Sequence, residues 1–186
     1  MISGPSGVGK SSIIDLLGRR RTFRFSVSAT TRPPRPGERH GVDYLFVDRA
    51  EFEALVAADE LLEWAEFGGN LYGTPRRPVQ TWLEEGEDVL LDIEIDGARQ
   101  IRVTFPTALF VFIAPPGLEE LRRRLEGRGD TSESEIRIRL ERARRDLAAA
   151  PEVFDALVVN RELERAVDLV DALIGSDGRV DHADTR

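Results

Sequence analysis

Gly4-Pro5-Ser6-Gly7-Val8-Gly9-Lys10-Ser11 decides the fold, because this stretch matches the phosphate-binding pattern G-x-x-x-x-G-K-[ST] at every fixed position. In such a loop the glycines let successive backbone N–H groups point at an anion, and the following helix adds the positive end of its dipole. We expect Lys10 to reach the β- and γ-phosphates of a nucleotide and the Ser11 hydroxyl to bind Mg²⁺. Apolar residues follow at the helical spacing that the motif requires: Ile13, Leu16 and Leu17.

Lys10 is also the single lysine of the chain, among 26 basic residues of which the others are arginine. A phosphate loop needs a compact ammonium group, whereas arginine carries a bulky planar head. The alternative is a general drift toward arginine with one accidental survivor. We expect Lys10→Arg to fold normally and to lose most turnover.

Composition bounds the class of protein. The 186 residues suit one domain that can carry inserted subdomains, and 41% of them are hydrophobic and 32% charged. The sequence has no apolar run of the roughly 18 residues that a membrane span needs. Without cysteine it has no disulfide, thiolate metal site or cysteine nucleophile. We therefore expect a cytoplasmic protein with no membrane partner, of unknown oligomeric state.

Charge is distributed unevenly along the chain. The net charge of −8 argues against a nucleic-acid partner, whose binding face is usually basic. Residues 1–41 carry 8 basic and 2 acidic side chains, whereas residues 42–100 carry 4 basic and 15 acidic ones. A local basic region beside the phosphate loop suits a small phosphorylated ligand. Arg19, Arg20 and Arg21 could equally form a solvated face.

Apolar runs and helical patterns alternate along the chain. The run at 89–93 ends near Asp92, and further buried strands are predicted at 109–113 and 156–159. Helices are predicted at about 10–21, 97–103, 118–126, 132–149 and 163–174. This alternation predicts an α/β fold of the P-loop NTPase type, a three-layer α/β/α arrangement around a parallel central sheet.

The acidic segment before these elements reads as an inserted α/β subdomain. Strands are predicted at 25–28, 43–47 and 63–67, and Asp48 is predicted to cap a helix. The segment 68–75 is predicted to form a turn and the start of a second helix. Only three residues precede the phosphate loop, fewer than the usual strand of about 5–6, so we expect the natural start to lie upstream.

Arg32 and Arg35 lie in a segment with three prolines and a glycine, which excludes regular structure. Two guanidinium groups on a stiff loop can clamp a second phosphate. Taken alone, the segment could equally be a surface turn or a proline-rich docking segment.

Four parts of the chain together resemble the guanylate kinase family, whose members transfer phosphate from ATP to GMP. The most specific part is Ser26-Val27-Ser28-Ala29-Thr30-Thr31-Arg32-Pro33-Pro34-Arg35-Pro36-Gly37-Glu38. The others are the phosphate loop, the pair formed by Glu63 and Tyr72-Gly73-Thr74, and the region 121–139. The resemblance covers nearly the whole chain in the right order.

The resemblance implies a GMP-binding subdomain at about 29–75. Four residues would hold the GMP phosphate: Arg32, Arg35, Tyr44 and Tyr72. Glu63 would accept hydrogen bonds from the guanine ring N–H and the exocyclic amine, two adjacent donors that adenine lacks. Ser28, Gly73 and Thr74 would lie near the base. Taken without the surrounding motif, Glu63 would read as a surface acid.

The resemblance also implies an ATP-binding side formed by the loop residues 4–11 with Ser12. Arg128 and Arg139 would come from a helical lid at about 116–149, with Arg139 also reaching the GMP side. Asn160 would lie near the adenine, and it could equally cap the end of a strand. Asp92 would lie between the two nucleotides and help to position Mg²⁺ through water, or the GMP side. The core would comprise about 1–28, 76–115 and 150–175, and 176–186 would be a flexible tail.

The implied activity is ATP-dependent phosphorylation of GMP, and of dGMP, with Mg²⁺ as cofactor. Lys10, Arg32, Asp92, Arg128 and Arg139 would be catalytic. Two alternatives stay open: a guanylate-kinase-like module that binds phosphorylated peptides, which would not need Lys10, and a kinase for another phosphorylated acceptor. The chain departs from the family pattern in its short first strand and at Asp96, where relatives often carry glutamine.

Overall fold

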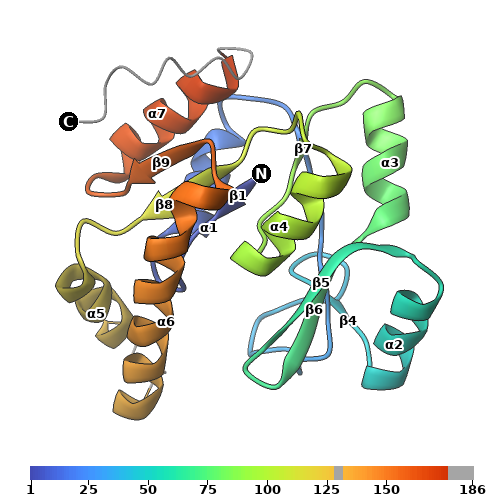
Figure 1. Cartoon of the computed structure of the whole chain (residues 1–186), viewed down its shortest axis with the longest axis horizontal. Coiled ribbons are helices and arrows are strands. Elements are labelled where there is room, and N and C mark those ends of the chain that lie inside the picture. The colour runs from blue at the N-terminus through green and yellow to red at the C-terminus, as the bar shows by residue number, and fades with distance from the viewer. Residues whose placement is uncertain (128–131, 176–186) are drawn as a thin grey trace. The chain divides into compact units, whose positions relative to one another are not determined.

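The computed structural model describes residues 1–127 and 132–175 of the chain. These residues form two compact units, which Figure 1 draws together with the rest of the chain. The first unit contains Met1 and Thr22–Ala108, and the second contains Ile2–Arg21 with the described residues from Leu109 onward. The tail expected at 176–186 lies outside the described residues. Among the described helices, none is both long and apolar enough to cross a membrane.

A parallel sheet of three short strands forms the centre of the second unit (Figure 1). β1 (Ile2–Ser3) and β9 (Ala156–Val159) both pair in parallel with β8 (Val111–Ala114), which lies between them. Every residue of β8 is buried, as expected for a strand inside a parallel sheet. The strand predicted at 109–113 starts later, at Val111, and the main chain of Phe110 before it is hydrogen-bonded to Asp155 and Ala156.

The described helices of the second unit pack on this sheet and on one another. α6 and α7 both contact β9, while α1 packs against α7 and α5 packs against α6. Parallel strands with packed helices confirm the predicted α/β/α class. The bounds of the helices are α1 (Lys10–Leu17), α5 (Leu118–Glu126), α6 (Glu133–Val153) and α7 (Leu163–Gly175).

α1 ends earlier than predicted, so the expectation of a helix through Arg21 is wrong. Gly18 caps the helix and donates its N–H to Ile14 O, and the N–H groups of Arg20 and Arg21 turn back to Leu17 O. This turn directs both arginine side chains to acidic residues of α7. Arg20 and Arg21 therefore form ion pairs, whereas the sequence also allowed a solvated arginine face. Arg20 pairs with Glu164 and Asp168, and Arg21 pairs with Asp171.

The first unit contains a four-stranded mixed sheet in the order β4-β3-β6-β5. Apolar side chains of the sheet and of α2 (Arg49–Ala57) form its core: Ala29, Phe52, Leu61 and Leu71. Asp48 caps α2 as predicted, in a capping box with Glu51. The bounds of the strands are β3 (Ala29–Thr30), β4 (Leu45–Phe46), β5 (Leu61–Phe67) and β6 (Asn70–Pro75).

The segment 70–75 is a strand, so the prediction of a turn followed at once by a helix is wrong. Gly68 and Gly69 both have positive φ, 57° and 78°, as a two-residue hairpin turn requires. The chain therefore returns as β6, antiparallel to β5, and this pairing brings Thr74 opposite Glu63. The helix that follows, α3 (Arg76–Glu84), begins only after Pro75.

A second parallel pair in the first unit joins β2 (Arg24–Phe25) to β7 (Val89–Leu90). Both strands are shorter than the predicted runs at 25–28 and 89–93, because only two residues of each take part in the parallel pairing. In place of one strand at 25–28, β2 ends at Phe25 and β3 begins at Ala29. After β7 the chain passes Asp92 and enters α4 (Ile95–Thr104), which packs against β5.

Candidate functional site

The phosphate-loop stretch lies in the second unit, between β1 and α1, as its motif predicts. The Lys10 side chain folds back over the loop, where its Nζ donates to Gly4 O at 2.7 Å, and Val8 N donates to Pro5 O at 3.1 Å. Ser11 and Ser12 are exposed in the first turn of α1. The loop therefore has the closed main-chain form and the ammonium group that phosphate binding requires.

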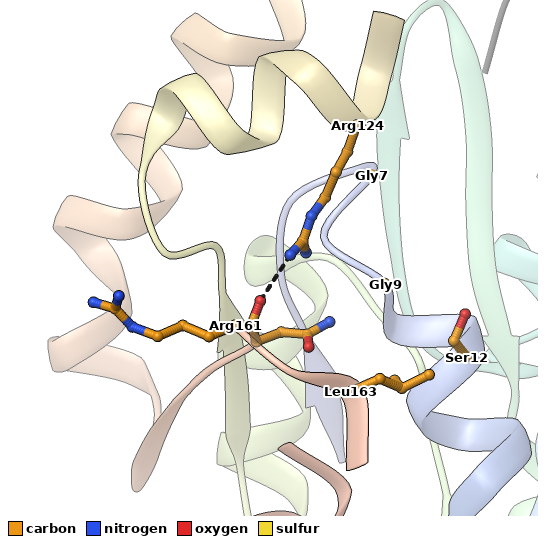
Figure 2. A pocket seen from close by; sticks show the side chains of 7 residues that line it. Gly7, Gly9, Ser12, Arg124, Arg161 and Leu163 are labelled. Carbon is orange, nitrogen blue, oxygen red and sulfur yellow. Dashed lines mark hydrogen bonds between the residues drawn. The ribbon is translucent and has the colours of Figure 1, made fainter. Parts of the chain in front are cut away.

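The Val8 carbonyl is held from outside the loop by two side chains. Asn160 Nδ2 donates to Val8 O at 2.8 Å, and Arg124 Nη1 donates to the same oxygen at 3.0 Å. Arg124 Nη2 also donates to Asn160 O at 3.0 Å, the bond that Figure 2 draws as a dashed line. Asn160 is buried, and it touches the loop instead of only capping β9.

A pocket of about 310 Å³ opens beside the loop (Figure 2). Its lining joins the loop, the start of α1 and the chain after β9: Gly7, Gly9, Ser12, Arg124, Asn160, Arg161 and Leu163. Arg124 and Arg161 are absent from the residues predicted from sequence. Arg124 is one of three consecutive arginines in α5, and nothing in the sequence distinguishes it from Arg123 or Arg122.

The structure describes one of the two arginines that were predicted to come from a lid. Arg139 comes from α6, and its Nη1 lies 3.4 Å from Ser6 Oγ, so the structure brings it to the phosphate loop. Arg128 lies outside the described residues.

In the first unit, two of the residues predicted to hold the GMP phosphate, Tyr44 and Tyr72, lie near Arg32. Its guanidinium carbon lies 5.4 Å from the Tyr44 ring centre, and the Tyr44 and Tyr72 rings meet edge to face at 6.0 Å. Burial, with smaller contributions from Asp92 and Tyr72, raises the Tyr44 pKa to about 12. Tyr44 therefore stays a protonated hydrogen-bond donor at neutral pH.

Glu38 fixes the loop that carries Arg32 and Arg35, a role that the sequence did not reveal. Arg32 binds both oxygens of Glu38, at 2.8 and 3.0 Å, and Arg35 N donates to Glu38 Oε2 at 2.6 Å. The hydrogen bonds that Arg32 donates to Glu38 lower the pKa of the Glu38 carboxyl and raise the pKa of Arg32. This bidentate ion pair fixes one edge of the Arg32 guanidinium and thereby its orientation.

Glu63 is buried in β5, where only 5% of it is exposed. The Thr74 hydroxyl donates to Glu63 Oε1 at 2.6 Å across the hairpin. Burial raises the pKa of Glu63 to about 7, against the opposing effect of the Thr74 hydrogen bonds, and the Glu94 carboxylate adds to the rise. A carboxylate that stays buried despite this desolvation penalty is a candidate for recognising paired N–H donors.

α4 shapes the surroundings of Glu63. A Cβ atom at Gly97 would overlap Glu63 Oε2, so only glycine leaves room for this carboxylate. Gln100, one turn later, donates from Nε2 to Trp64 O at 2.8 Å and accepts from Trp64 N at 3.2 Å, which ties α4 to β5. Glu94, Gly97 and Gln100 were not among the predicted site residues, because their proximity to β5 is visible only in the fold.

The remaining predicted residues lie around these two groups. Ser28 precedes β3 and accepts from Leu45 N, while Gly73 is buried in the middle of the sheet. Asp92 follows β7, close enough to Tyr44 to affect its pKa. Within residues 1–127 and 132–175, no group of three or more His, Asp or Glu side chains could hold a metal ion.

Comparison with known proteins identifies the family. The family model of guanylate kinase matches residues 1–177. The guanylate kinase of Thermobifida fusca is 56% identical over 177 residues, which cover 95% of this chain and 90% of that protein. That of Synechococcus sp. (strain JA-3-3Ab) is 52% identical over 175 residues, or 94% and 80% of the two chains.

A solved structure agrees with these sequence matches. The crystal structure of guanylate kinase from Anaplasma phagocytophilum superposes with a TM-score of 0.79 at 32% identity, covering 97% of this chain and 85% of that one. The phosphate loop, the Arg32 group and the buried Glu63 thus lie in a chain that belongs to the guanylate kinase family.

Proposed function

We propose that the protein transfers the terminal phosphoryl group of ATP to GMP, giving ADP and GDP, and that it accepts dGMP as well. The observation that carries this proposal is the buried Glu63 carboxylate with Thr74 beside it. A phosphate loop alone supports only the use of a nucleoside triphosphate, whereas a buried acceptor of two N–H donors supports guanine as the base.

ATP is the proposed ligand of the second unit. The N–H groups of the loop 4–11 and the Lys10 ammonium would bind its phosphates, with Ser12 and the pocket beside the loop, which Asn160 lines, toward its base. Arg139 would neutralise charge on the transferring group, and its proximity to Ser6 supports this role. The same role is proposed for Arg128 from the sequence alone. Residues 116–149 would form the lid.

GMP is the proposed ligand of residues 29–75 in the first unit. Its phosphate would be held by Arg32, Arg35, Tyr44 and Tyr72, and the protonated Tyr44 hydroxyl supports that assignment. Glu63, with Ser28, Gly73 and Thr74 nearby, would bind guanine. The unpaired carboxylate that another base would leave behind provides the discrimination.

The proposed reaction needs no general base, because the GMP phosphate is already an anionic nucleophile at neutral pH. One of its oxygens forms the new bond to the γ-phosphorus of ATP, and the bond from that phosphorus to the β,γ-bridging oxygen breaks, so ADP leaves with the electron pair. The protein contributes alignment and charge neutralisation. Aligning two bound substrates can remove on the order of 7–11 kcal/mol of the barrier.

Mg²⁺ is the proposed cofactor and would supply charge neutralisation on the ATP phosphates. Ser11, exposed at the first turn of α1, would bind it directly, and Asp92 would do so through water. This sparse donor set fits a cation that keeps several waters and is held largely by substrate phosphates.

An assay of ADP formation with GMP, dGMP, IMP, AMP and no acceptor tests the proposal. We expect turnover with GMP and dGMP, slower turnover with IMP, which lacks the exocyclic amine, and negligible turnover with AMP or without acceptor. Glu63→Gln should lower kcat/KM for GMP by about 100-fold, which corresponds to the free energy of hydrogen bonds to a charged group. Glu66→Gln is the matched control, since Glu66 is exposed on the same strand.

Two results would contradict the proposal. Equal turnover of AMP and GMP would remove guanine as the substrate base. A well-folded protein that binds GMP without forming ADP in the presence of ATP would instead be a binding module.

A further inference from the structure

We infer that Arg124 and Asn160 are positioning residues that orient the Val8–Gly9 peptide and thereby aim the Gly9 N–H at the nucleotide phosphates. The inference rests on the proposed function, because it assumes that the phosphate loop binds the triphosphate. It assigns to both side chains an action through the loop instead of a contact with the base.

The Val8 carbonyl is the point on which the two side chains converge. Its oxygen accepts from Asn160 Nδ2 at 2.8 Å and from Arg124 Nη1 at 3.0 Å, so both of its lone pairs are used. Arg124 Nη2 also donates to the main-chain carbonyl of Asn160 at 3.0 Å (Figure 2), so the Arg124 guanidinium joins the Val8 carbonyl to the end of β9. The two side chains thus hold the same carbonyl through separate hydrogen bonds.

Planarity of the peptide bond transmits this restraint to the phosphate side. In a trans peptide the C=O and the following N–H point in opposite directions, and the barrier to rotation about the bond keeps them so. Holding Val8 O toward β9 and α5 fixes the direction of the Gly9 N–H on the opposite side of the same plane. Turning that N–H away would require breaking both hydrogen bonds to the Val8 carbonyl.

Gly9 fits this arrangement in two ways. Its φ of 103° is a conformation that suits glycine, and a Cβ atom there would lie 2.6 Å from Asn160 Nδ2. The glycine of the motif thus provides both the loop conformation and the space through which the Asn160 amide reaches the Val8 carbonyl.

Arg124 differs from its neighbours on α5 in making these contacts. Arg122 pairs with Glu126 and Glu133, and Arg123 pairs with Glu120 while its side chain stays 77% exposed. Arg124 also pairs with Glu120, at 2.8 Å, but in addition reaches Val8 O and Asn160 O. Arg123→Met is therefore a matched control, since it removes a charge and a Glu120 pair on the same helix without touching the loop.

The test compares binding of ATP with binding of inorganic tripolyphosphate, which has no base, both with Mg²⁺. Titration calorimetry is applied to the wild-type protein and to Asn160→Leu, Arg124→Met, Arg123→Met and Lys10→Met. We expect Asn160→Leu and Arg124→Met to weaken both ligands by about the same factor, tenfold or more, as loss of an oriented hydrogen-bond donor predicts. Arg123→Met should bind both ligands as the wild type does.

A spectroscopic measurement separates positioning from a general loss of stability. In the wild-type protein, tripolyphosphate should move the Gly9 amide proton downfield in the NMR spectrum, because that N–H donates to the anion. With ligand at saturation, the movement should be reduced in Asn160→Leu and Arg124→Met and kept in Arg123→Met. A full downfield movement in the first two variants would overturn the inference, whatever their melting temperatures.

Three further results of the binding measurements would overturn the inference. If Asn160→Leu and Arg124→Met weaken ATP but leave tripolyphosphate unchanged, both residues act on the base. If Lys10→Met weakens tripolyphosphate while those two variants do not, the inference fails and the proposed phosphate site stands. If Lys10→Met itself binds tripolyphosphate as the wild type does, the proposed phosphate site fails and the inference fails with it.

Discussion

The two units of the protein prepare for a phosphate by different physical means. In the second unit the anion-binding groups are main-chain N–H groups of the phosphate loop, and side chains such as Asn160 act on the carbonyl that lies behind them. In the first unit the groups are side chains, and Arg32 is held in place by a second side chain, Glu38. A main-chain site depends on peptide orientation, whereas a side-chain site depends on ion pairing and burial.

The base site in the first unit extends this contrast. Glu63 is kept buried beside a second acid, Glu94, and burial raises its pKa to about 7. The loop of the second unit requires little comparable desolvation, because its donors are neutral peptide groups near the surface. The raised pKa of Glu63 marks a destabilising buried charge in the first unit, so substitutions in the two units should have different effects on activity and stability.

Lys10→Arg should have the largest effect on activity, and it changes only the phosphate loop of the second unit. The planar head cannot replace the ammonium that folds back to Gly4 O, so we expect kcat to fall by about 10²–10³-fold, as for loss of one transition-state donor. The KM for GMP and the melting temperature should stay near their wild-type values. Steady-state kinetics decides the matter, and near-normal turnover would show that the loop does not need a compact cation.

Glu63→Gln should stabilise the fold at pH 8 by up to about 3 kcal/mol, the free energy that corresponds to a pKa raised from 4.5 to about 7. Because the folded-state pKa is raised, this carboxyl favours the folded state fully below its unfolded pKa of 4.5. That contribution is lost as the pH rises through 7. Urea unfolding at pH 8 and pH 4 measures the difference between variant and wild type, which should vanish at pH 4.

Gly97→Ala should disturb the base site without changing any group that binds the ligand. The added Cβ would overlap Glu63 Oε2 and displace the carboxylate, so kcat/KM for GMP should fall by roughly 30-fold, within the range for a charged hydrogen bond. The KM for ATP should not change. Val103→Ala is the control on the same helix, because Val103 is 84% exposed. Unaltered GMP kinetics in Gly97→Ala would mean that Glu63 does not bind the base.

The pH dependence of GMP use should follow Glu63. With a pKa of about 7, the carboxyl is roughly nine-tenths ionised at pH 8 and one-tenth ionised at pH 6, so kcat/KM for GMP should fall about tenfold over that range. GMP itself also titrates in this range, so the informative quantity is the difference from Glu63→Gln. That variant should lose the Glu63 contribution, and parallel pH profiles for the two proteins would contradict this assignment.

Asp48→Ala should have the smallest effect, since it removes a capping box from α2 that touches neither site. We expect a loss of about 1 kcal/mol in the free energy of unfolding, typical of a helix N-cap. The KM values for ATP and GMP should be unchanged. A raised KM for GMP alone would indicate that α2 contributes to the GMP site beyond its packing under β3 and β6.

Sequence patterns predicted most of the fold and part of the site, and the successes share a cause. The phosphate loop, the Asp48 cap, α5 and β9 are encoded by adjacent residues, so their spacing suffices. β6 was not predicted, because the sequence at Gly68 and Gly69 also suits a turn before a helix. Their positive φ angles instead form a hairpin turn between two strands. The residues around Glu63 and Val8 come from distant segments, and no local pattern distinguishes them.

The same limit applies to Arg124. Its two neighbours have the same chemistry and the same helix, and only the direction of the side chain separates a loop contact from a surface ion pair. Periodicity assigns such a residue to a face of the helix but cannot name the atom that it reaches.

The Lys10 side chain has a consequence for labelling chemistry. Because the sequence contains one lysine, amine-directed reagents have one ε-amino target, and that amine lies on the phosphate loop with a hydrogen bond to Gly4 O. Acylation of this residue, read by mass spectrometry, would report directly on loop occupancy, because a nucleotide that engages the ammonium shields it from the reagent. Lys10 can therefore serve as a native footprinting site for nucleotide binding at the phosphate loop.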